Sequence, residues 1–203
     1  QRLGLMTCLG QLAFLAAVVP LLNLESRKRK AELLRPWAEA LSDLKIDHHV
    51  QSANSQEAIS ILSKYNPDIV VVNGTRILSK ATLECIPAPF INMHAGLTPR
   101  YRGVHGGYWA LAEGRADLVG TTVHLVDPGI DSGAPLEQVT FTVSNDDNYA
   151  SYPILHTLAG VPSLVSQVRL VAEGKISAKS GPEPSRLWYH PTLLQYLQGR
   201  LLK

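Results

Sequence analysis

Cysteine is scarce in this chain of 203 residues, which contains only Cys8 and Cys85. Two cysteines form at most one disulfide, so the sequence excludes a disulfide-stapled fold and favours a reducing, cytoplasmic location. An excess of charge of one sign is lacking too, because 19 Lys and Arg residues face 17 Asp and Glu residues, a formal net charge of +2. Such a balance carries no electrostatic signature of nucleic-acid binding, and we expect no nucleic-acid partner.

Long charged runs and low-complexity segments are also absent. Hydrophobic residues make up 45% of the chain and charged residues 18%, which excludes a disordered or collagen-like protein. At roughly 150 residues per domain, the length fits one large domain with an appendage. We expect the main domain in residues 1–175, and a C-terminal loop and packing helix in residues 176–203.

The longest apolar stretch covers residues 3–22 and approaches the length of a membrane span. It is interrupted by Thr7, Gly10, Gln11 and Pro20. We therefore interpret it as a buried strand over residues 3–7 and a buried helix over residues 12–22, and we expect no membrane partner. An α/β fold then requires a second strand, yet the next helix follows at once, which indicates a strand and loop missing from the numbered sequence near residues 22–25.

Beyond this stretch, apolar runs typical of strands alternate with amphipathic runs typical of helices. The predicted strands cover residues 46–50, 69–72, 90–93, 119–126 and 137–143. The predicted helices cover residues 25–44, 56–65, 80–84, 107–113, 153–173 and 188–203. The β-branched run at residues 69–72 is typical of a strand buried on both faces of a parallel sheet. The alternation predicts an α/β fold with a doubly wound, mostly parallel sheet flanked by helices.

Polar side chains crowd into two short stretches that follow predicted strands. The first, NMHAGLTPRYRG, begins with Asn92 and His94, which are two residues apart and share one side of a strand. The second, GTTVHLVDPGIDSG, runs through a glycine-rich loop to the carboxylate of Asp131. In open α/β sheets, ligands bind at the carboxyl ends of the strands. An amide, an imidazole and a carboxylate gathered there supply what acyl transfer needs: a hydrogen-bond donor, a titratable group and a charge that sets its pKa.

These two stretches resemble the signature of the folate-dependent formyltransferases. That family includes glycinamide ribonucleotide formyltransferase, the catalytic domain of methionyl-tRNA formyltransferase and the sugar N-formyltransferases. Its Asn-x-His pair, Pro-x-x-x-Gly loop and Asp-containing turn are matched by Asn92, His94 and the Ile130-Asp131-Ser132-Gly133 turn. The resemblance covers residues 69–136 and implies a Rossmann-like formyltransferase domain in residues 1–175. It also implies transfer of a formyl group from 10-formyltetrahydrofolate to a primary amine of a small acceptor.

The resemblance further implies which residues act. Asn92 and a protonated His94 would donate hydrogen bonds to the oxyanion, while Asp131 would orient His94 and raise its pKa. The implied folate site comprises Gly74, Arg76, Ile77, Leu78, Val126, Asp127, Gly129 and Ile130. Where the purine-pathway members carry a glycine-rich phosphate loop, this chain has one glycine, which weakens the case for a ribonucleotide. We expect the acceptor site to include Gly10, His105, Tyr108 and Tyr152.

Several alternatives stay open. A formyltetrahydrofolate hydrolase would use the same three residues with water as the acceptor, and a non-catalytic module would bind folate only. A metal hydrolase is another alternative, and its candidate metal ligands are His48, His49, His94, His105, His124 and Asp131. The spacing of these residues fits no known metal motif, so we expect no metal. We expect no tRNA-binding domain, and therefore no tRNA substrate. The sequence does not identify the amine, or decide whether residues 188–203 mediate a homodimer.

Overall fold

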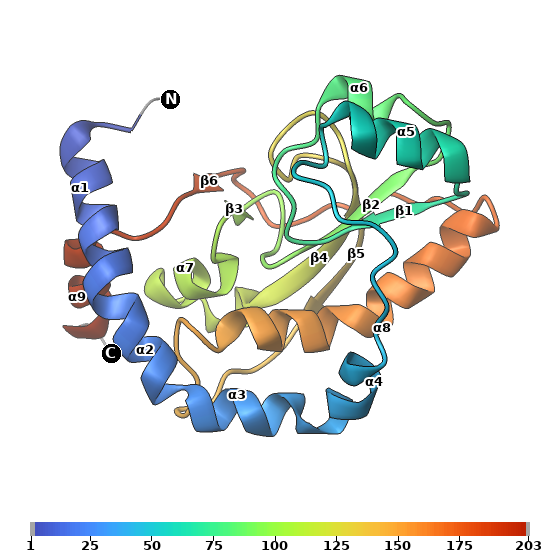
Figure 1. Ribbon diagram of the computed structural model, residues 1–203. Helices are drawn as coiled ribbons and strands as arrows, with labels where there is room; N and C mark the ends of the chain where they lie inside the picture. The colour runs from blue at the N-terminus through green and yellow to red at the C-terminus, as the bar shows by residue number, and fades with distance from the viewer. Residues whose placement is uncertain (1–2, 202–203) are drawn as a thin grey trace.

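The computed structural model has a central sheet surrounded by helices, and it describes residues 3–201 (Figure 1). The four-stranded sheet has the order β1-β2-β4-β5. β1 (Val70–Val72) runs parallel to β2 (Phe90–His94). β4 (Gly120–Leu125) is antiparallel to β2 and also to β5 (Pro135–Thr140). A small second sheet pairs β3 (Arg102–Gly103) with β6 (Leu187–Trp188), which ties the C-terminal segment to the loop after β2.

The helices lie on both sides of the main sheet and along one end of it. α8 (Tyr152–Ala172) packs across β4 and β5, as Figure 1 shows. The other helices and helical turns are α1 (Leu5–Ala13), η1 (Phe14–Val18), α2 (Val19–Glu25), α3 (Arg27–Leu34), η2 (Arg35–Trp37), α4 (Ala38–Ser42), α5 (Gln56–Tyr65), α6 (Lys80–Leu83), α7 (Gly106–Ala112), η3 (Ala116–Leu118) and α9 (Leu193–Leu201).

From α5 onward the predicted elements are present, within a few residues at each end. Ser55 caps α5 as its sequence position suggests, because its hydroxyl accepts a hydrogen bond from the amide of Ala58 at 3.1 Å. The helix predicted over residues 188–203 begins only at Leu193, and residues 202 and 203 lie outside the described part of the chain. The α/β class with a sheet flanked by helices is therefore confirmed.

The prediction of a mostly parallel sheet is wrong for the main sheet as described, where one of three strand pairs is parallel. The connection from β4 to β5 explains part of this difference. It covers residues 126–134, which is too short for the crossover helix that a parallel pair needs. β1 also ends the strand order, so Val71 is 46% exposed instead of buried on both faces.

Two further strand predictions are wrong. Residues 46–50 are exposed and form no strand, and none of the described strands pairs with them. Residues 3–7 form no strand: from Leu5 onward they belong to a helix that continues through α1, η1 and α2 to Glu25. Pro20 does not interrupt this helix, since it occupies the first turn of α2, where its missing N–H costs little.

The chain is also continuous where we inferred a missing strand. The amide of Ser26 donates to the carbonyl of Leu22 at 3.0 Å, so α2 passes directly into α3. The inference of a missing segment near residues 22–25 is therefore wrong. The helix Leu5–Glu25 and α8 are both long and apolar enough to cross a membrane, by length and composition alone.

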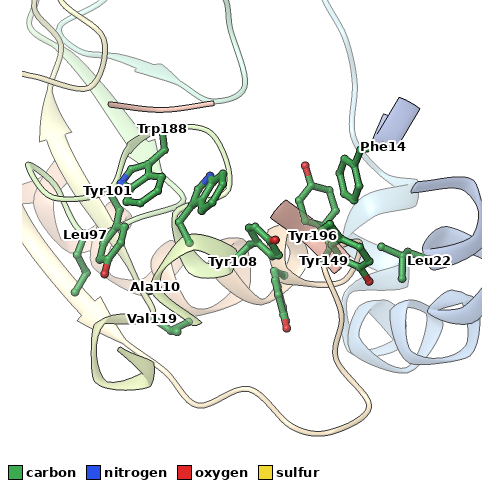
Figure 2. Packing of buried hydrophobic residues seen from close by; sticks show 12 residues of the cluster. Phe14, Leu22, Leu97, Tyr101, Tyr108, Ala110, Val119, Tyr149, Trp188 and Tyr196 are labelled. Atoms are coloured by element: carbon green, nitrogen blue, oxygen red, sulfur yellow. The ribbon is translucent and has the colours of Figure 1, made fainter. Parts of the chain in front are cut away.

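An aromatic cluster forms the larger part of the core and holds the N-terminal helix to the body. Phe14 is fully buried, with ring centroids 5.0 Å from those of Tyr149 and Tyr196. At the other end of the cluster, Trp188 lies beside Tyr101 (Figure 2). The rings of Trp188 and Trp109 stack with their centroids 4.5 Å apart. The cluster joins η1 and α2 to α7, α9 and the loop before α8.

Phe14→Ala tests this attachment. Removing a fully buried ring should lower the free energy of unfolding by about 3–5 kcal/mol, measured by urea denaturation. Leu12→Ala is the matched control, because Leu12 lies two residues away and is exposed, so its loss should change stability by less than about 0.5 kcal/mol. Equal effects of the two substitutions would contradict the described packing of the helix.

Candidate active site

The residues singled out from the sequence gather around one cavity of about 770 Å³. It is lined by the ends of β1 and β2, the loop after β4, and the first turns of α7 and α8. All three predicted catalytic residues and all eight predicted folate-site residues line it, as do His105, Tyr108 and Tyr152. Gly10 does not. It lies on α1 against the side chain of Thr192, so its predicted substrate role is wrong, because residues 7–11 form a helix instead of a phosphate-binding loop.

The two motifs meet through strand register. β2 and β4 are antiparallel, with Asn92 opposite His124. The loop after β4 then turns back and brings Asp131 beside β2. Asp131 has φ +47°, a left-handed conformation that is uncommon outside glycine and typical of tight turns at functional sites.

His94 is buried and held at both ring nitrogens. Nε2 lies 2.7 Å from the carbonyl oxygen of Tyr101, which accepts a hydrogen bond and so places a proton on Nε2. Nδ1 lies 3.3 Å from Oδ2 of Asp131. Burial lowers the pKa of His94 below its ordinary value, and the charge of Asp131 and the Tyr101 carbonyl offset this only in part. Asp131 therefore raises the pKa of His94 as expected, but burial lowers it by more, so the ring is mainly neutral at pH 7.

Asp131 contacts each part of the site. Burial works to raise its pKa, but His124 and His94 when protonated, together with the amide of Gly103, hold that pKa below its ordinary value. Its Oδ2 accepts the Gly103 N–H at 3.0 Å. Gly103 has φ +94°, and a Cβ there would meet the Trp188 carbonyl oxygen, so only glycine fits at this donor. The carboxylate is therefore charged at neutral pH.

His124 fixes the direction of the Asn92 amide. Its Nδ1 lies 2.7 Å from the Leu125 carbonyl oxygen and must carry the proton, which leaves Nε2 as an acceptor. The amide nitrogen of Asn92 donates to that Nε2 at 3.1 Å and approaches Oδ1 of Asp131 at 3.4 Å. We weighed His124 from the sequence only as a metal ligand. Its place beside Asn92 depends on strand register, which sequence spacing does not reveal.

Two loops form the opposite side of the cavity. Residues 73–78 are held by Asn54, whose amide nitrogen donates to the Ile77 carbonyl at 2.8 Å and whose oxygen accepts the Ser79 N–H at 2.7 Å. Nothing in the sequence around Asn54 indicated this role. In the other loop, the Asp127 carboxylate accepts the Gly129 N–H at 3.0 Å and the Ser132 hydroxyl at 2.9 Å. Ile77 is 55% exposed although apolar, and it lines the cavity.

Neutral aromatic and imidazole groups form the wall nearest α7 and α8. Burial lowers the pKa of His105 to about 4, assisted by the nearby His190. Burial also raises the pKa of Tyr108 and of Tyr152 to about 12. His156, which the sequence did not single out, lines the same wall with its pKa lowered to about 3 by burial. This wall therefore presents uncharged polar groups at neutral pH.

Within residues 3–201, no three side chains of the His, Cys, Asp or Glu type are grouped as metal ligands would be. The arrangement can instead hold a charged carboxylate against a neutral imidazole and an oriented amide. Such a set can accept a proton from a substrate and stabilise the positive charge that results.

Known proteins are similar to this chain in sequence and in fold. The pattern that defines the formyl transferase family fits residues 17–153. The methionyl-tRNA formyltransferase of Thermodesulfovibrio yellowstonii is 31% identical over 66% of this chain and 43% of its own length. That of Myxococcus xanthus is 34% identical over 69% of this chain and 44% of its own length. The chain thus spans less than half of these two relatives.

Solved structures share the fold. Glycinamide ribonucleotide transformylase 1 from Symbiobacterium toebii has a TM-score of 0.55 and 26% identity, covering 61% of this chain and 58% of its own. The formyltransferase PseJ from Anoxybacillus kamchatkensis, solved with tetrahydrofolate and a formamido sugar nucleotide, has a TM-score of 0.55 and 22% identity. It covers 77% of this chain and 80% of its own.

The contact between His94 and Asp131 can be tested by titrating the His94 ring. Asp131→Asn removes a negative charge that raises the pKa of His94, so the midpoint of the His94 ring should move further below 6.5 in ¹⁵N NMR titrations. Asp127→Asn alters a carboxylate of the same loop that bonds only within that loop, and should leave the midpoint in place. A midpoint unchanged by Asp131→Asn would show that the two side chains are not coupled.

Proposed function

The chain belongs to the formyl transferase family, and from that premise we propose that it transfers a formyl group from 10-formyltetrahydrofolate to a primary amine of a small acceptor. The observation that carries the proposal is the meeting of Asn92, His94 and Asp131 at one cavity. These are the three residues for which the resemblance implied catalytic roles.

The opposite side of the cavity suits the folate co-substrate. The whole cavity has a volume of about 770 Å³, which lies in the range of small-molecule sites. The loops at residues 73–78 and 126–130 offer backbone donors and acceptors, which can read the polar edge of a pterin. The exposed Ile77 side chain would be covered by a flat ring, which explains an apolar group at this position.

The chemistry follows from the charges of the three side chains. The amine attacks the formyl carbon and forms the new C–N bond, and the bond from that carbon to N10 breaks. Neutral His94 accepts the proton that the amine loses, through Nδ1, while Asp131 stabilises the imidazolium. The proton then passes to N10, so tetrahydrofolate leaves and no net proton is consumed.

Asn92 acts on the oxygen of the tetrahedral intermediate. Its N–H toward Asp131 spans 3.4 Å, a long contact, so it can turn to a developing oxyanion at small cost. The N–H to His124 meanwhile holds the amide in its orientation. His124 is thus a positioning residue for Asn92.

The acceptor we propose is a small hydroxylated or sugar-like amine. Gly10 lies outside the cavity, so it would not bind a phosphate of this acceptor. The wall formed by His105, Tyr108 and Tyr152 is uncharged at neutral pH, and it has the size and polarity to face such a ligand. A formamido sugar nucleotide accompanies the PseJ structure, which shares this fold.

Substitution of the three residues tests the proposed mechanism. Asn92→Ala, His94→Ala and Asp131→Ala should each lower turnover at least about a hundredfold, since losing one oxyanion donor costs on the order of 3 kcal/mol. Formyl transfer is followed by mass spectrometry with a panel of amino sugars as acceptors. Asp117→Ala is the control, because its exposed carboxylate pairs with Arg115 and does not line the cavity. Full turnover in any one of the three variants would remove that residue from the mechanism.

The same assay separates the alternatives. Release of formate from 10-formyltetrahydrofolate without any amine would identify a hydrolase instead. Formylation of methionyl-tRNA, but of no small amine, would contradict the acceptor class. Folate binding without turnover toward any acceptor would identify a binding module.

A further inference from the structure

The helix Leu5–Glu25 presents an apolar face to solvent along its whole length. Its side chains that are at least half exposed include Leu5, Met6, Leu9, Leu12, Leu21 and Leu24. The helix has a mean hydropathy of 2.1, and no charged residue occurs from Leu5 to Leu24. On α9, which lies beside α1 in Figure 1, Leu194 and Leu197 are also exposed and extend the patch. Apolar surfaces of this extent mark contacts with a partner or a membrane.

Only the opposite, narrow face of the helix is attached to the body. Phe14 and Leu22 enter the aromatic cluster, and the Gln11 amide donates to the His190 carbonyl at 2.7 Å. Gly10 meets the Thr192 side chain. Crossing a membrane would pull Phe14 and Leu22 out of the core, so the helix keeps its place and only its outward face is free to bind.

The chemistry of this face fits lipid better than protein. Protein interfaces are about as polar as the remaining surface and carry charged rims, whereas this face has no charge over five turns. At 1.5 Å per residue the helix is about 31 Å long. Directly after it comes the basic run Arg27-Lys28-Arg29-Lys30. Arg29 pairs with Asp147 and Lys30 bonds Asn23, whereas Arg27 and Lys28 are exposed, with the Lys28 ammonium 4.0 Å from the exposed Glu32 carboxylate.

We propose that the outward face of the helix Leu5–Glu25 docks on an anionic lipid surface, lying in the plane of the membrane. The leucine side chains enter the acyl boundary, and Arg27 and Lys28 contact the negative headgroups at one end of the helix. The protein would then bind at the membrane surface without spanning it. This replaces the expectation of no membrane partner, and it holds whichever substrate the active site takes.

Vesicle flotation tests the docking face. The wild-type protein should float with vesicles of equal parts phosphatidylcholine and phosphatidylglycerol, and less with phosphatidylcholine alone. Leu9→Glu combined with Leu12→Glu should lower the bound fraction at least about tenfold, because charges replace two exposed leucines that would enter the acyl boundary on binding. Leu44→Glu combined with Ile46→Glu is the matched control, since both are exposed apolar side chains in a segment far from the helix. Circular dichroism checks that each variant is folded.

The basic residues give a second readout. Arg27→Gln combined with Lys28→Gln should reduce binding to the anionic vesicles several-fold, while the Lys64→Gln, Lys175→Gln control leaves it unchanged. Wild-type protein that floats with neither vesicle, or leucine variants that float as well as the wild type, would overturn the proposal. Failure to float together with a wild-type dimer that dissociates in the Leu9, Leu12 variant would assign the face to a second copy of the chain.

Discussion

The carboxylate of Asp131 is the contact on which the candidate site depends. It lies against His94 and Asn92 of β2 and against the Gly103 amide of β3 at once. The Gly103 amide is available because β3 pairs with β6, so the C-terminal segment holds the loop that supports the carboxylate. A charge buried this far is costly unless it is hydrogen-bonded, and here the protein supplies the partners before any substrate binds. The same charge allows His94 to take up a proton during the reaction although burial disfavours it.

The parts of the site set by local sequence were predictable. Asn92 and His94 are two residues apart on a strand, and the loop residues from Gly74 to Leu78 follow β1 directly, so spacing and resemblance placed them at the cavity. The contact between Asn92 and His124 was not predictable, because it arises from the register of antiparallel strands where a parallel sheet was expected. Asn54 was missed for a similar reason: the loop it holds is 23 residues away in sequence.

The pKa of His94 shows how environment alters a role inferred from residue type. Pairing with a carboxylate suggests an imidazolium, yet the ring is buried and desolvation outweighs the pairing. The N-terminal helix shows the converse limit. Its composition correctly predicted an apolar segment, but composition does not reveal which face of a helix the rest of the protein covers. Of the side chains in this helix, only Phe14 and Leu22 are buried. A stretch that looked like a strand and a core helix is a single helix with a free apolar side.

The most direct test of the account is calorimetric titration with 5-formyltetrahydrofolate, a stable analogue of the formyl donor. The account predicts micromolar binding to the wild-type protein. Ile77→Asp should weaken it at least about tenfold, because the side chain that covers the pterin would then carry a charge. Absence of binding to the folded wild-type protein, or equal binding by the Ile77→Asp variant, would contradict the assignment of this cavity to folate.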